Sequence, residues 1–559
     1  MQPPELLRID DRLATLGRGL GAMRLRIGEG LLRLETLDGI RALGFPSLEA
    51  YACEALGRTG RWGSDVRALA RRLSALPRLR SALVTGALSS SMVELVSRVA
   101  TPDDDGAWVE RAGQMTVRAM RAYLKTDSIE IADDEMPERV AITTTVDRID
   151  AWAFERARLM VEAVGARRGD EAIEAMLAEG LTEILARDPD VDLPAGLVGT
   201  LERESRAFRA ELAALHETAE AAADALTARE PVEYAPETEI GWPGDVAGID
   251  ACLRQAAREL ARRDLELADL GRRVAEHERW RELGYRSFDH YCRERIGLSP
   301  SSMATRVAFA RRLGGLGAIG DAVAGGHIGW EAAAAIARVA GPATVGNWIA
   351  RAQARTVKHL REEIDAVEMA ARADGVAVRE LGPPDAETLA EARALERSTI
   401  AMIIGEAPDE TTDEGQMSGI EPAAGVPTTT LRFSVGEETG RFWRALERLH
   451  AQQRNDPAES FVAFLVRSVM RAWLGARPAA VAYADVYVRD RWRCASPVCR
   501  SRSVTPHHVR FRSHGGGDEP TNVISLCETC HLELVHGGRL TVSGLAPASL
   551  HWRAAGWSA

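Results

Sequence analysis

Cysteine is scarce in this chain, at seven of 559 residues, which argues against a scaffold built on disulfides. No apolar run approaches the roughly 18–20 residues of a membrane-spanning helix, so we expect no membrane segment. The N-terminus, MQPPELLRIDDRL, lacks a basic region followed by an apolar one. A secretion signal is therefore not indicated, and we expect a cytoplasmic protein.

The composition is otherwise that of a folded protein, with 46% apolar and 27% charged residues. This excludes a chain that is disordered as a whole, and the length suggests about three or four domains. The net charge of −12 is spread unevenly. The last 79 residues hold nine Arg, no Lys and six acids, a net of +3, so the rest carries −15. An acidic bulk disfavours non-specific contact with nucleic acid, so any DNA contact is expected at the C-terminal end.

A repeat indicates that the chain arose by internal duplication. Residues 43–121 match residues 283–361 without a gap, at a constant offset of 240, and 25 of 79 positions are identical. Chance agreement between helices rich in Ala, Leu and Arg would be patchier and would need gaps. A duplication predicts two modules of similar fold. The recurring residues include Leu43-Gly44 and Leu283-Gly284, Arg98-Val99-Ala100 and Arg338-Val339-Ala340, and Trp108 and Trp348.

The similarity between the two copies continues more weakly beyond these helices. Ile142–Val146 resembles Thr429–Phe433, and each is an extended run rich in β-prone residues. A helical segment is expected after each run, at residues 148–187 and 437–475.

The second copy is longer than the first. Its extra length includes an acidic, polar stretch rich in Gly and Pro at 405–427, which we interpret as a flexible insertion. A further helix is expected at roughly 198–228. We predict a mainly α protein made of duplicated helical modules, with a small C-terminal α+β domain. The predicted domains are a first helical module at 1–240, a second at 241–480 and a small domain at 481–559.

The notable residues of the helical modules have ordinary structural interpretations. Trp108 and Trp348 are expected to pack in the core. The pairs Arg71-Arg72 and Arg311-Arg312 lie at helical spacing away from the apolar positions. We expect them on a solvated face or in buried ion pairs, with phosphate contact as the alternative. No catalytic chemistry is assigned to residues 1–480.

Four of the seven cysteines and six of the twelve histidines fall in the last 79 residues. Cys494 and Cys499 form a C-x4-C pair, and Cys527 and Cys530 form a C-x2-C pair. Four thiolates suit tetrahedral Zn²⁺, and such short spacings let each pair chelate from one turn. We predict a structural zinc site, with buried or spare thiols as the alternative.

The histidines suggest a second site. His507 and His508 are adjacent, and on an extended strand their side chains point to opposite faces. One of them can then hold a metal while the other faces a water molecule, and His531 is expected on a short helix. The predicted order is a strand (Thr505–Phe511), a loop (Gly515–Gly517), a second strand (Val523–Leu526) and a helix from near Cys527 to Gly537-Gly538.

The spacing of these residues resembles that of the HNH endonuclease family. Asn522 follows His508 by fourteen residues, and His531 follows nine further on. The run from Leu526 to His531 has the pattern LCxxCH, Gly515-Gly516 match the loop glycines, and the first cysteine pair stands where zinc-bearing members place a knuckle. The resemblance covers about residues 481–545. The helical part more loosely resembles regions that precede HNH modules in some bacterial proteins.

The resemblance implies a ββα-metal fold and cleavage of DNA phosphodiesters that leaves a 5′-phosphate and a 3′-hydroxyl. His507 and His531 would ligate the catalytic ion, His508 would be the general base, and Asn522 would orient the loop and the base. The chemistry agrees, because a divalent ion neutralises charge that develops on the phosphate and the leaving oxygen. A neutral imidazole can take a proton from water at cellular pH.

Three further polar residues are candidate parts of this site. Arg510 and Arg512 are placed to meet phosphates, or they form an ordinary charged strand face. Family members often have another His four residues after the helix His, whereas His536 follows His531 by five. In an α-helix five residues rotate by about 140° from the first residue and four by about 40°. His536 is therefore a candidate ligand only if the helix ends or bulges before it, and His514 is expected in the loop.

The sequence leaves two functions open. The leading one is a metal-dependent HNH endonuclease acting on DNA, whose acidic modules position it, bind a protein partner or restrain it. The alternative is a non-catalytic zinc knuckle that docks on nucleic acid or protein. Such a scaffold has no need of His507, His508, Asn522 and His531 at active-site spacing, which favours the nuclease. The ion could be Mg²⁺, Mn²⁺, Ni²⁺ or Zn²⁺, and cutting both strands with one site would favour a homodimer or two encounters.

Overall fold

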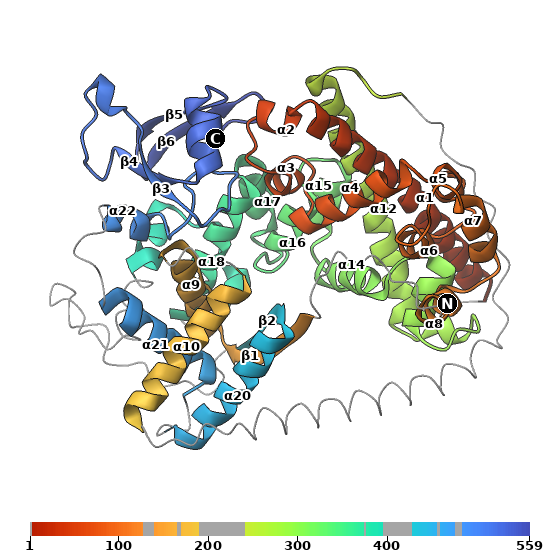
Figure 1. Cartoon of the computed structure of the whole chain (residues 1–559), viewed down its shortest axis with the longest axis horizontal. Coiled ribbons are helices and arrows are strands. Elements are labelled where there is room, and N and C mark those ends of the chain that lie inside the picture. Colours follow the sequence, from red (N-terminus) through yellow and green to blue (C-terminus); the bar gives the residue numbers. More distant parts are fainter. Residues whose placement is uncertain are drawn as a thin grey trace.

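The computed structural model shows a mainly helical chain with a small α+β module at its C-terminal end (Figure 1). This confirms the predicted fold class. In the described part of the chain the strands form three two-stranded antiparallel sheets. The helix expected at 198–228 and the insertion expected at 405–427 lie outside the described residues. The structure describes residues 3–126, 139–164, 169–188, 241–373, 376–394, 428–454, 459–475 and 483–559.

The helices before the first strand and their counterparts in the second copy follow one order. The pairs α5 and α15, and α6 and α16, begin and end 240 residues apart. In the first copy the helices are α1 (Pro3–Thr36), α2 (Gly39–Ala42), α3 (Leu48–Glu54), α4 (Gly60–Leu73), α5 (Pro77–Val84), α6 (Ser90–Val96), α7 (Asp105–Gly113) and α8 (Val117–Thr126). In the second they are α12 (Val246–Ala275), η1 (Arg279–Arg281), α13 (Phe288–Tyr291), η2 (Cys292–Ile296), α14 (Pro300–Arg312), α15 (Gly317–Ala324), α16 (Trp330–Ile336), α17 (Val345–Ala354), α18 (Val357–Ala373) and η3 (Val378–Glu380).

The same local signals start corresponding helices in both copies. The hydroxyl of Thr59 caps α4 by accepting a hydrogen bond from the Trp62 amide at 3.1 Å. The hydroxyl of Ser299 caps α14 in the same way, from the Ser302 amide at 3.3 Å, and Pro300 follows it at the first helical position. A capped first turn satisfies backbone donors that the helix itself leaves unpaired.

The long helices α1 and α12 pack against each other and lie next to one another in Figure 1. They share one apolar core, and in it Leu13, Leu20, Leu253 and Leu260 are at most 1% exposed. The copies therefore form one body rather than two separate globules.

Contacts between the copies occur in related pairs, as in a dimer with two-fold symmetry. Three hydrogen bonds are each found twice, with both partners moved by 240 positions. The phenols of Tyr51 and Tyr291 donate to Asp250 and Asp10, respectively. The backbone amides of Glu331 and Ser91 donate to the carbonyls of Gly57 and Gly297. The amides of Val357 and Val117 donate to the carboxylates of Glu54 and Glu294.

Gly57 and its counterpart Gly297 show why one identity survives in the repeat. Both have a positive φ, of 62° and 78°, a conformation that favours glycine. A Cβ on Gly57 would lie 2.7 Å from the Gly329 Cα, and one on Gly297 would lie 2.6 Å from the Ser89 Cβ. Any side chain at either position would push the two copies apart.

A strand from each copy joins a unit of four helices. β1 (Arg139–Asp147) and β2 (Thr428–Gly436) are antiparallel, and Thr143 pairs with Arg432 at the middle of both strands. Their inward residues are Ile142 and Val146, and Leu431 and Val435. The sequence comparison aligned Ile142 of the first copy with Thr429 of the second. This alignment was wrong by two residues, because the buried positions of the strands make Leu431 the counterpart of Ile142. The helices are α9 (Arg148–Val164), α10 (Asp170–Arg187), α20 (Glu437–Gln453) and α21 (Phe461–Gly475).

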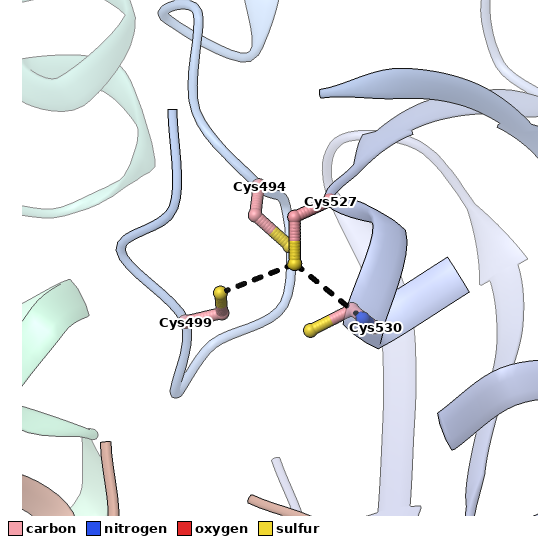
Figure 2. Close-up of side chains that lie close together, drawn as sticks. All are labelled: Cys494, Cys499, Cys527 and Cys530. Atoms are coloured by element: carbon pink, nitrogen blue, oxygen red, sulfur yellow. Dashed lines mark hydrogen bonds between the residues drawn. The ribbon is translucent and has the colours of Figure 1, made fainter. Parts of the chain in front are cut away.

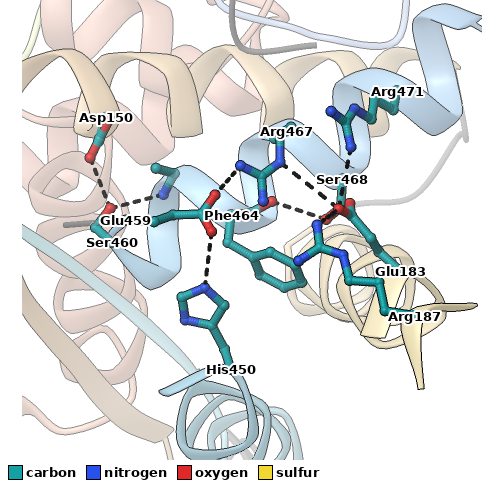
Figure 3. Close-up of polar contacts among 11 residues, drawn as sticks. Asp150, Glu183, Arg187, His450, Glu459, Ser460, Phe464, Arg467, Ser468 and Arg471 are labelled. Atoms are coloured by element: carbon teal, nitrogen blue, oxygen red, sulfur yellow. Dashed lines mark hydrogen bonds and ion pairs between the residues drawn. The ribbon is translucent and has the colours of Figure 1, made fainter. Parts of the chain in front are cut away.

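Polar side chains hold α21 in this unit, as Figure 3 shows. Ser460 donates to Asp150 of α9 at 2.8 Å, and Ser468 donates to Glu183 of α10 at 2.5 Å. His450 of α20 lies 3.5 Å from a carboxylate oxygen of Glu459, and burial lowers the pKa of its imidazole. The network fastens helices from both copies to one another.

The structure confirms the core role of the two repeated tryptophans, since Trp108 is 6% exposed and Trp348 is fully buried. Of the arginine pairs, Arg71 is exposed and ion-paired with Glu35, and Arg72 donates to Ser97. These contacts support the ordinary interpretation of the arginines. None of the described helices combines the length and apolarity of a membrane span.

The C-terminal module contains two β-hairpins and three short helical segments. The first strand ends at His508 rather than at Phe511 as expected, because the chain bends into the loop there. The second hairpin was not anticipated. The elements are α22 (Ala484–Arg489), β3 (Thr505–His508), η4 (Arg512–His514), β4 (Val523–Leu526), η5 (Thr529–His536), β5 (Leu540–Leu545) and β6 (Ser549–Ala554). The domain boundaries at 240 and 480 stay predictions.

The end of the chain docks the module on the first helical copy. The Gly556 amide donates to the Leu43 carbonyl, and the Trp557 indole donates to the Gly44 carbonyl, each at 3.0 Å. A Cβ on Gly44 would lie 2.2 Å from the Cβ of Ala554. The Leu43-Gly44 pair, which recurs in the repeat, therefore forms a docking site for the C-terminal module.

A buried lysine docks the module on the second copy. Lys358, in the first turn of α18, is 5% exposed and donates to the carbonyls of Cys494 at 2.7 Å and Ser496 at 2.9 Å. The Thr356 hydroxyl donates to the Pro497 carbonyl at 2.8 Å. Because a buried ammonium must be fully hydrogen-bonded, this contact fixes the cysteine-bearing loop on the helical body.

Candidate metal centres and active site

The β3–β4 hairpin and the helix η5 together position the polar residues of the module. Antiparallel pairing sets His507 opposite Ile524 and His508 opposite Val523. All four residues of β4 are buried, so this strand is the core of the module. The helix begins just after β4, which brings its histidines back beside β3.

The four cysteines form one buried cluster, drawn from two distant turns (Figure 2). Their sulfur atoms all lie within 4.8 Å of one another, and those of Cys499 and Cys527 are 3.7 Å apart. Four sulfurs about 2.3 Å from a tetrahedral zinc lie roughly 3.8 Å apart. None of the four is in a disulfide. The geometry therefore fits a zinc ion held by Cys494, Cys499, Cys527 and Cys530.

The surroundings of the cysteines also suit a bound cation. The amides of Ser501 and Cys530 donate to the sulfurs of Cys499 and Cys527, each at 3.4 Å. Burial raises the pKa of the Cys494 thiol, whereas hydrogen bonds from the other three cysteines lower the pKa of Cys527. Several thiolates buried away from solvent need a positive ion to balance their charge.

Three histidines form a second cluster. The nitrogens of His507, His531 and His536 that could hold an ion lie within 4.8 Å of one another. The ring centroids of His507 and His531 are 4.8 Å apart, and those of His531 and His536 are 5.0 Å apart. Solvent exposure increases across the cluster, since His507 is buried, His531 is half-buried and His536 is exposed.

The helix geometry explains how His536 joins the cluster despite its spacing. The segment η5 is a π-helix over Thr529–His536, in which residues five apart lie one above the other. The α-helical rotation that would have turned His536 away therefore does not apply. The helix bulges, which is the condition under which the sequence allowed His536 as a ligand.

The buried His507 is well suited to bind a metal ion. Its Nε2 is buried, and no residue in the described ranges forms a hydrogen bond with it. Burial, with the nearby His531 and His536, lowers the pKa of His507 to about 4, so the ring is neutral and offers a lone pair. A buried nitrogen without a partner is costly unless something binds there.

His531 is oriented by a residue that the sequence did not single out. Its Nδ1 lies 3.0 Å from the hydroxyl of Thr505, which in turn lies 3.2 Å from the Leu526 carbonyl. The hydroxyl can donate to that carbonyl and accept from Nδ1–H, which leaves Nε2 of His531 for an ion. Hydrogen bonds of this kind are the usual support of a ligand histidine.

His508 lies on the opposite face of β3 from His507, as the adjacent spacing predicted. Its Nε2 is 2.7 Å from a carboxylate oxygen of Asp518, and the Arg512 side chain reaches both groups. The Tyr483 phenol also donates to Asp518, at 2.8 Å. Hydrogen bonds from Arg512, His508 and Tyr483 lower the pKa of Asp518, which keeps it ionised.

Asn522 clamps the loop between the two strands. Its side-chain oxygen accepts from the Arg510 amide at 2.8 Å, and its amide nitrogen donates to the carbonyls of Arg510 at 3.1 Å and Gly517 at 2.8 Å. A Cβ on Gly516 would lie 1.9 Å from the Arg510 carbonyl oxygen, so the loop closes tightly only with glycine. This is the position expected of a residue that orients the loop.

The remaining candidates lie around this loop. Arg510 is exposed and donates to the His514 carbonyl at 2.9 Å. Arg512 is 61% exposed but is engaged by Asp518 and the Tyr483 hydroxyl. His514 is exposed at the end of η4 and lies outside both clusters.

Comparison with known families agrees with this geometry. Residues 492–536 match the family model of the HNH endonuclease, and residues 250–407 match that of a domain of unknown function, DUF222. Comparisons with curated proteins and with solved structures found no match. The HNH match spans both cysteine pairs, the hairpin and η5. The chain therefore carries a C-terminal module of the HNH endonuclease type with a four-cysteine cluster. A helical region precedes this module, and the second copy in that region is of the DUF222 type.

Proposed function

We propose that the protein is a metal-dependent endonuclease that hydrolyses phosphodiester bonds of DNA. The observation that carries the proposal is the pairing of two different clusters in one small module, with His508 beside an Asp on the other face of β3. A zinc knuckle that only binds a partner would need the cysteines alone. The family match supports a nuclease and a nucleic-acid substrate.

In this proposal His507, His531 and His536 hold the catalytic ion. Their imidazoles would accept Mg²⁺, Mn²⁺, Ni²⁺ or Zn²⁺ with different affinities. Such an ion, when bound, supplies positive charge for the phosphate and the leaving oxygen. The three nitrogens leave coordination positions open, as a catalytic site requires.

His508 acts as the general base. In this proposal Nε2 carries the proton and donates it to Asp518 at 2.7 Å. The Nε of Arg512, which lies 3.2 Å from both Nε2 and the Asp518 oxygen, then donates to Asp518 rather than to His508. That tautomer leaves the Nδ1 lone pair to take a proton from water. Asp518 therefore orients the ring and stabilises its positive charge after proton transfer, and Asn522 holds the loop that carries Asp518.

The substrate meets the module at its exposed basic side chains. Arg510 and Arg512 lie on the loop beside His508, where their guanidinium groups can contact phosphates on either side of the cleaved bond. The products would be a 5′-phosphate and a 3′-hydroxyl. We further propose a cytoplasmic location, and cleavage of both strands by a homodimer or by two successive encounters.

The test is cleavage of supercoiled plasmid by the full chain, in EDTA and in each of the four ions. We expect nicking that needs an ion and that falls by about 10²–10⁴-fold in His508→Ala, the usual contribution of a general base. His551→Ala, which removes an exposed histidine of β6 outside both clusters, should cleave like the parent. A folded His508→Ala protein that cleaves at the parental rate would remove the base assignment. No cleavage with any ion would favour the zinc-knuckle alternative.

A further inference from the structure

A cleft between the two helical copies, away from the C-terminal module, has the features of a ligand site. Its volume is about 610 Å³, within the roughly 300–1,000 Å³ of small-molecule sites. Eighteen of its twenty lining residues form nine pairs that are 240 positions apart. Thr59 and Ser299 are one such pair, and Arg24 and Asp264 are another. The cleft therefore lies on the approximate two-fold axis of the duplication.

The two walls of the cleft have diverged in charge. Arg58 in the first copy corresponds to Leu298 in the second, and Arg61 corresponds to Ser301. A purely structural interface between related copies has no need to gather arginines on one wall. The first-copy wall thus carries three arginines, Arg24, Arg58 and Arg61, whereas the second-copy wall carries one, Arg306, beside several hydroxyl groups.

Arg58 is the central residue of the charged wall. Its side chain is 7% exposed, and its guanidinium lies 5.5 and 5.6 Å from the ring centroids of Trp62 and Trp330. One nitrogen, Nη1, pairs with Asp264 at 2.5 Å. Its Nε and Nη2 are buried and have no hydrogen-bond partner among the residues that the structure describes. Two buried donors of one cation need an acceptor.

The lining holds four arginines and four carboxylates, but Arg58 has no carboxylate of its own. Asp264 is fully buried and is shared by Arg58 and Arg306, whose nitrogens lie 2.5 and 2.6 Å from its oxygens. One carboxylate thus serves two guanidinium groups. Two other carboxylates of the lining are matched one to one, Glu94 with Arg24 and Glu331 with Arg361, and burial raises the pKa of a further lining carboxylate, Asp65.

Two helices point their N-termini at the same cleft. Thr59 and Ser299, the caps of α4 and α14, both line it, together with Arg61 and Ser301 in the first turns. These helices have 14 and 13 residues, so each contributes a positive dipole end. Backbone amides at a helix start, next to an arginine fork, are a common way to hold the oxygens of a phosphate.

We propose that this cleft binds a small phosphate-bearing anion, which Arg58 and the first turns of α4 and α14 hold between the two copies. The phosphate could be inorganic phosphate or the phosphate of a small ester such as a nucleoside monophosphate. The proposal does not rest on the nuclease function, because every residue used here belongs to the helical body.

The test is calorimetric titration of the full chain with sodium phosphate and with AMP, at constant ionic strength set with chloride. We expect one site per chain. Arg58→Leu, which installs the residue of the other copy, should raise the Kd by about 10- to 100-fold, the effect of losing charge-assisted hydrogen bonds. Arg71→Leu removes an exposed arginine paired with Glu35 outside the cleft and should bind like the parent. Arg58→Lys keeps the positive charge but loses the several parallel N–H donors of the guanidinium. This variant should bind phosphate with intermediate affinity.

The outcomes separate the sources of the phosphate and can overturn the site. Equal affinity for phosphate and AMP would assign the phosphate group alone, and much tighter binding of AMP would assign a nucleoside phosphate. Absence of binding by the folded parent would refute the site. So would parental affinity for phosphate in both Arg58→Lys and Arg58→Leu. If Arg58→Leu fails to fold, Arg58→Lys against Arg71→Leu still decides.

Discussion

The four-cysteine and three-histidine clusters lie in one module but differ in burial and in the number of ligands. All four cysteines are buried, and they offer zinc a complete tetrahedral shell from the protein. The histidines number three, and one of them is exposed to solvent. A closed set of ligands leaves nothing for a substrate to bind, whereas an open set does. From this comparison we propose that a zinc ion at the cysteines would hold the fold and that an ion at the histidines would take part in chemistry.

The largest effect should come from breaking the closed cluster. Cys527→Ser is expected to lose the zinc and unfold the C-terminal module, because a structural zinc can contribute about 10–16 kcal/mol in small peptides. Zinc content and limited proteolysis would report both losses. Cys252→Ser, which changes a half-buried cysteine of α12 outside the cluster, is the matched control. A Cys527→Ser module that stays folded without zinc would contradict a structural role.

Removing a histidine should have a smaller and more local effect. His536→Ala is expected to weaken binding of the exchangeable ion by at least about tenfold while leaving the zinc in place. Titration of the ion by calorimetry would measure this. Deletion of the exposed Leu532 is a second variant for the same titration. It would reduce the spacing from His531 to His536 to four residues, which an α-helix places on one face. Ion binding that survives in His536→Ala would remove this residue from the ligand set.

Asp518, the neighbour of the proposed general base His508, offers a third test. Asp518→Asn is expected to slow plasmid nicking by about 10- to 100-fold, the usual cost of a lost orienting group, without changing either metal content. Asp269→Asn, on the exposed face of α12, controls for the loss of a carboxylate. An unchanged nicking rate in Asp518→Asn would show that His508 needs no orientation by this loop.

The smallest expected effect concerns how the closed cluster is docked. Lys358→Met removes the donor to the carbonyls of Cys494 and Ser496 and should destabilise the protein by about 1–3 kcal/mol, the cost of buried groups left unpaired. Denaturant unfolding would measure the change, and the zinc should stay bound. Arg71→Met is a control of equal charge change at an exposed site. A Lys358→Met protein as stable as the parent would mean that the module is held by other contacts alone.

The residues of the two clusters could be found in the sequence because short spacings encode them. Cysteine pairs within one turn and adjacent histidines on a strand keep their meaning in any surroundings. His536 was the harder case, since the spacing of five is compatible with a cluster only in a π-helix. Sequence spacing alone does not reveal which helix type the chain will adopt.

Other parts of the site depend on contacts that the local sequence does not encode. Asp518 meets His508 only because the loop closes, and Thr505 meets His531 only because η5 folds back on β3. The docking of the module through Lys358 joins residues 136 positions apart. One signal was present, because Lys358 is one of two lysines among 70 basic residues. A compact ammonium with three donors suits two converging carbonyls better than an arginine fork does.

The most direct test of the two-cluster account is to dialyse the full chain against EDTA and then measure zinc content and plasmid nicking on the same sample. The account predicts that nicking is lost while one zinc per chain remains, and that adding a divalent ion back restores nicking. Nicking that persists in EDTA, or that disappears only when the last zinc leaves, would contradict the separation of a structural from a catalytic ion.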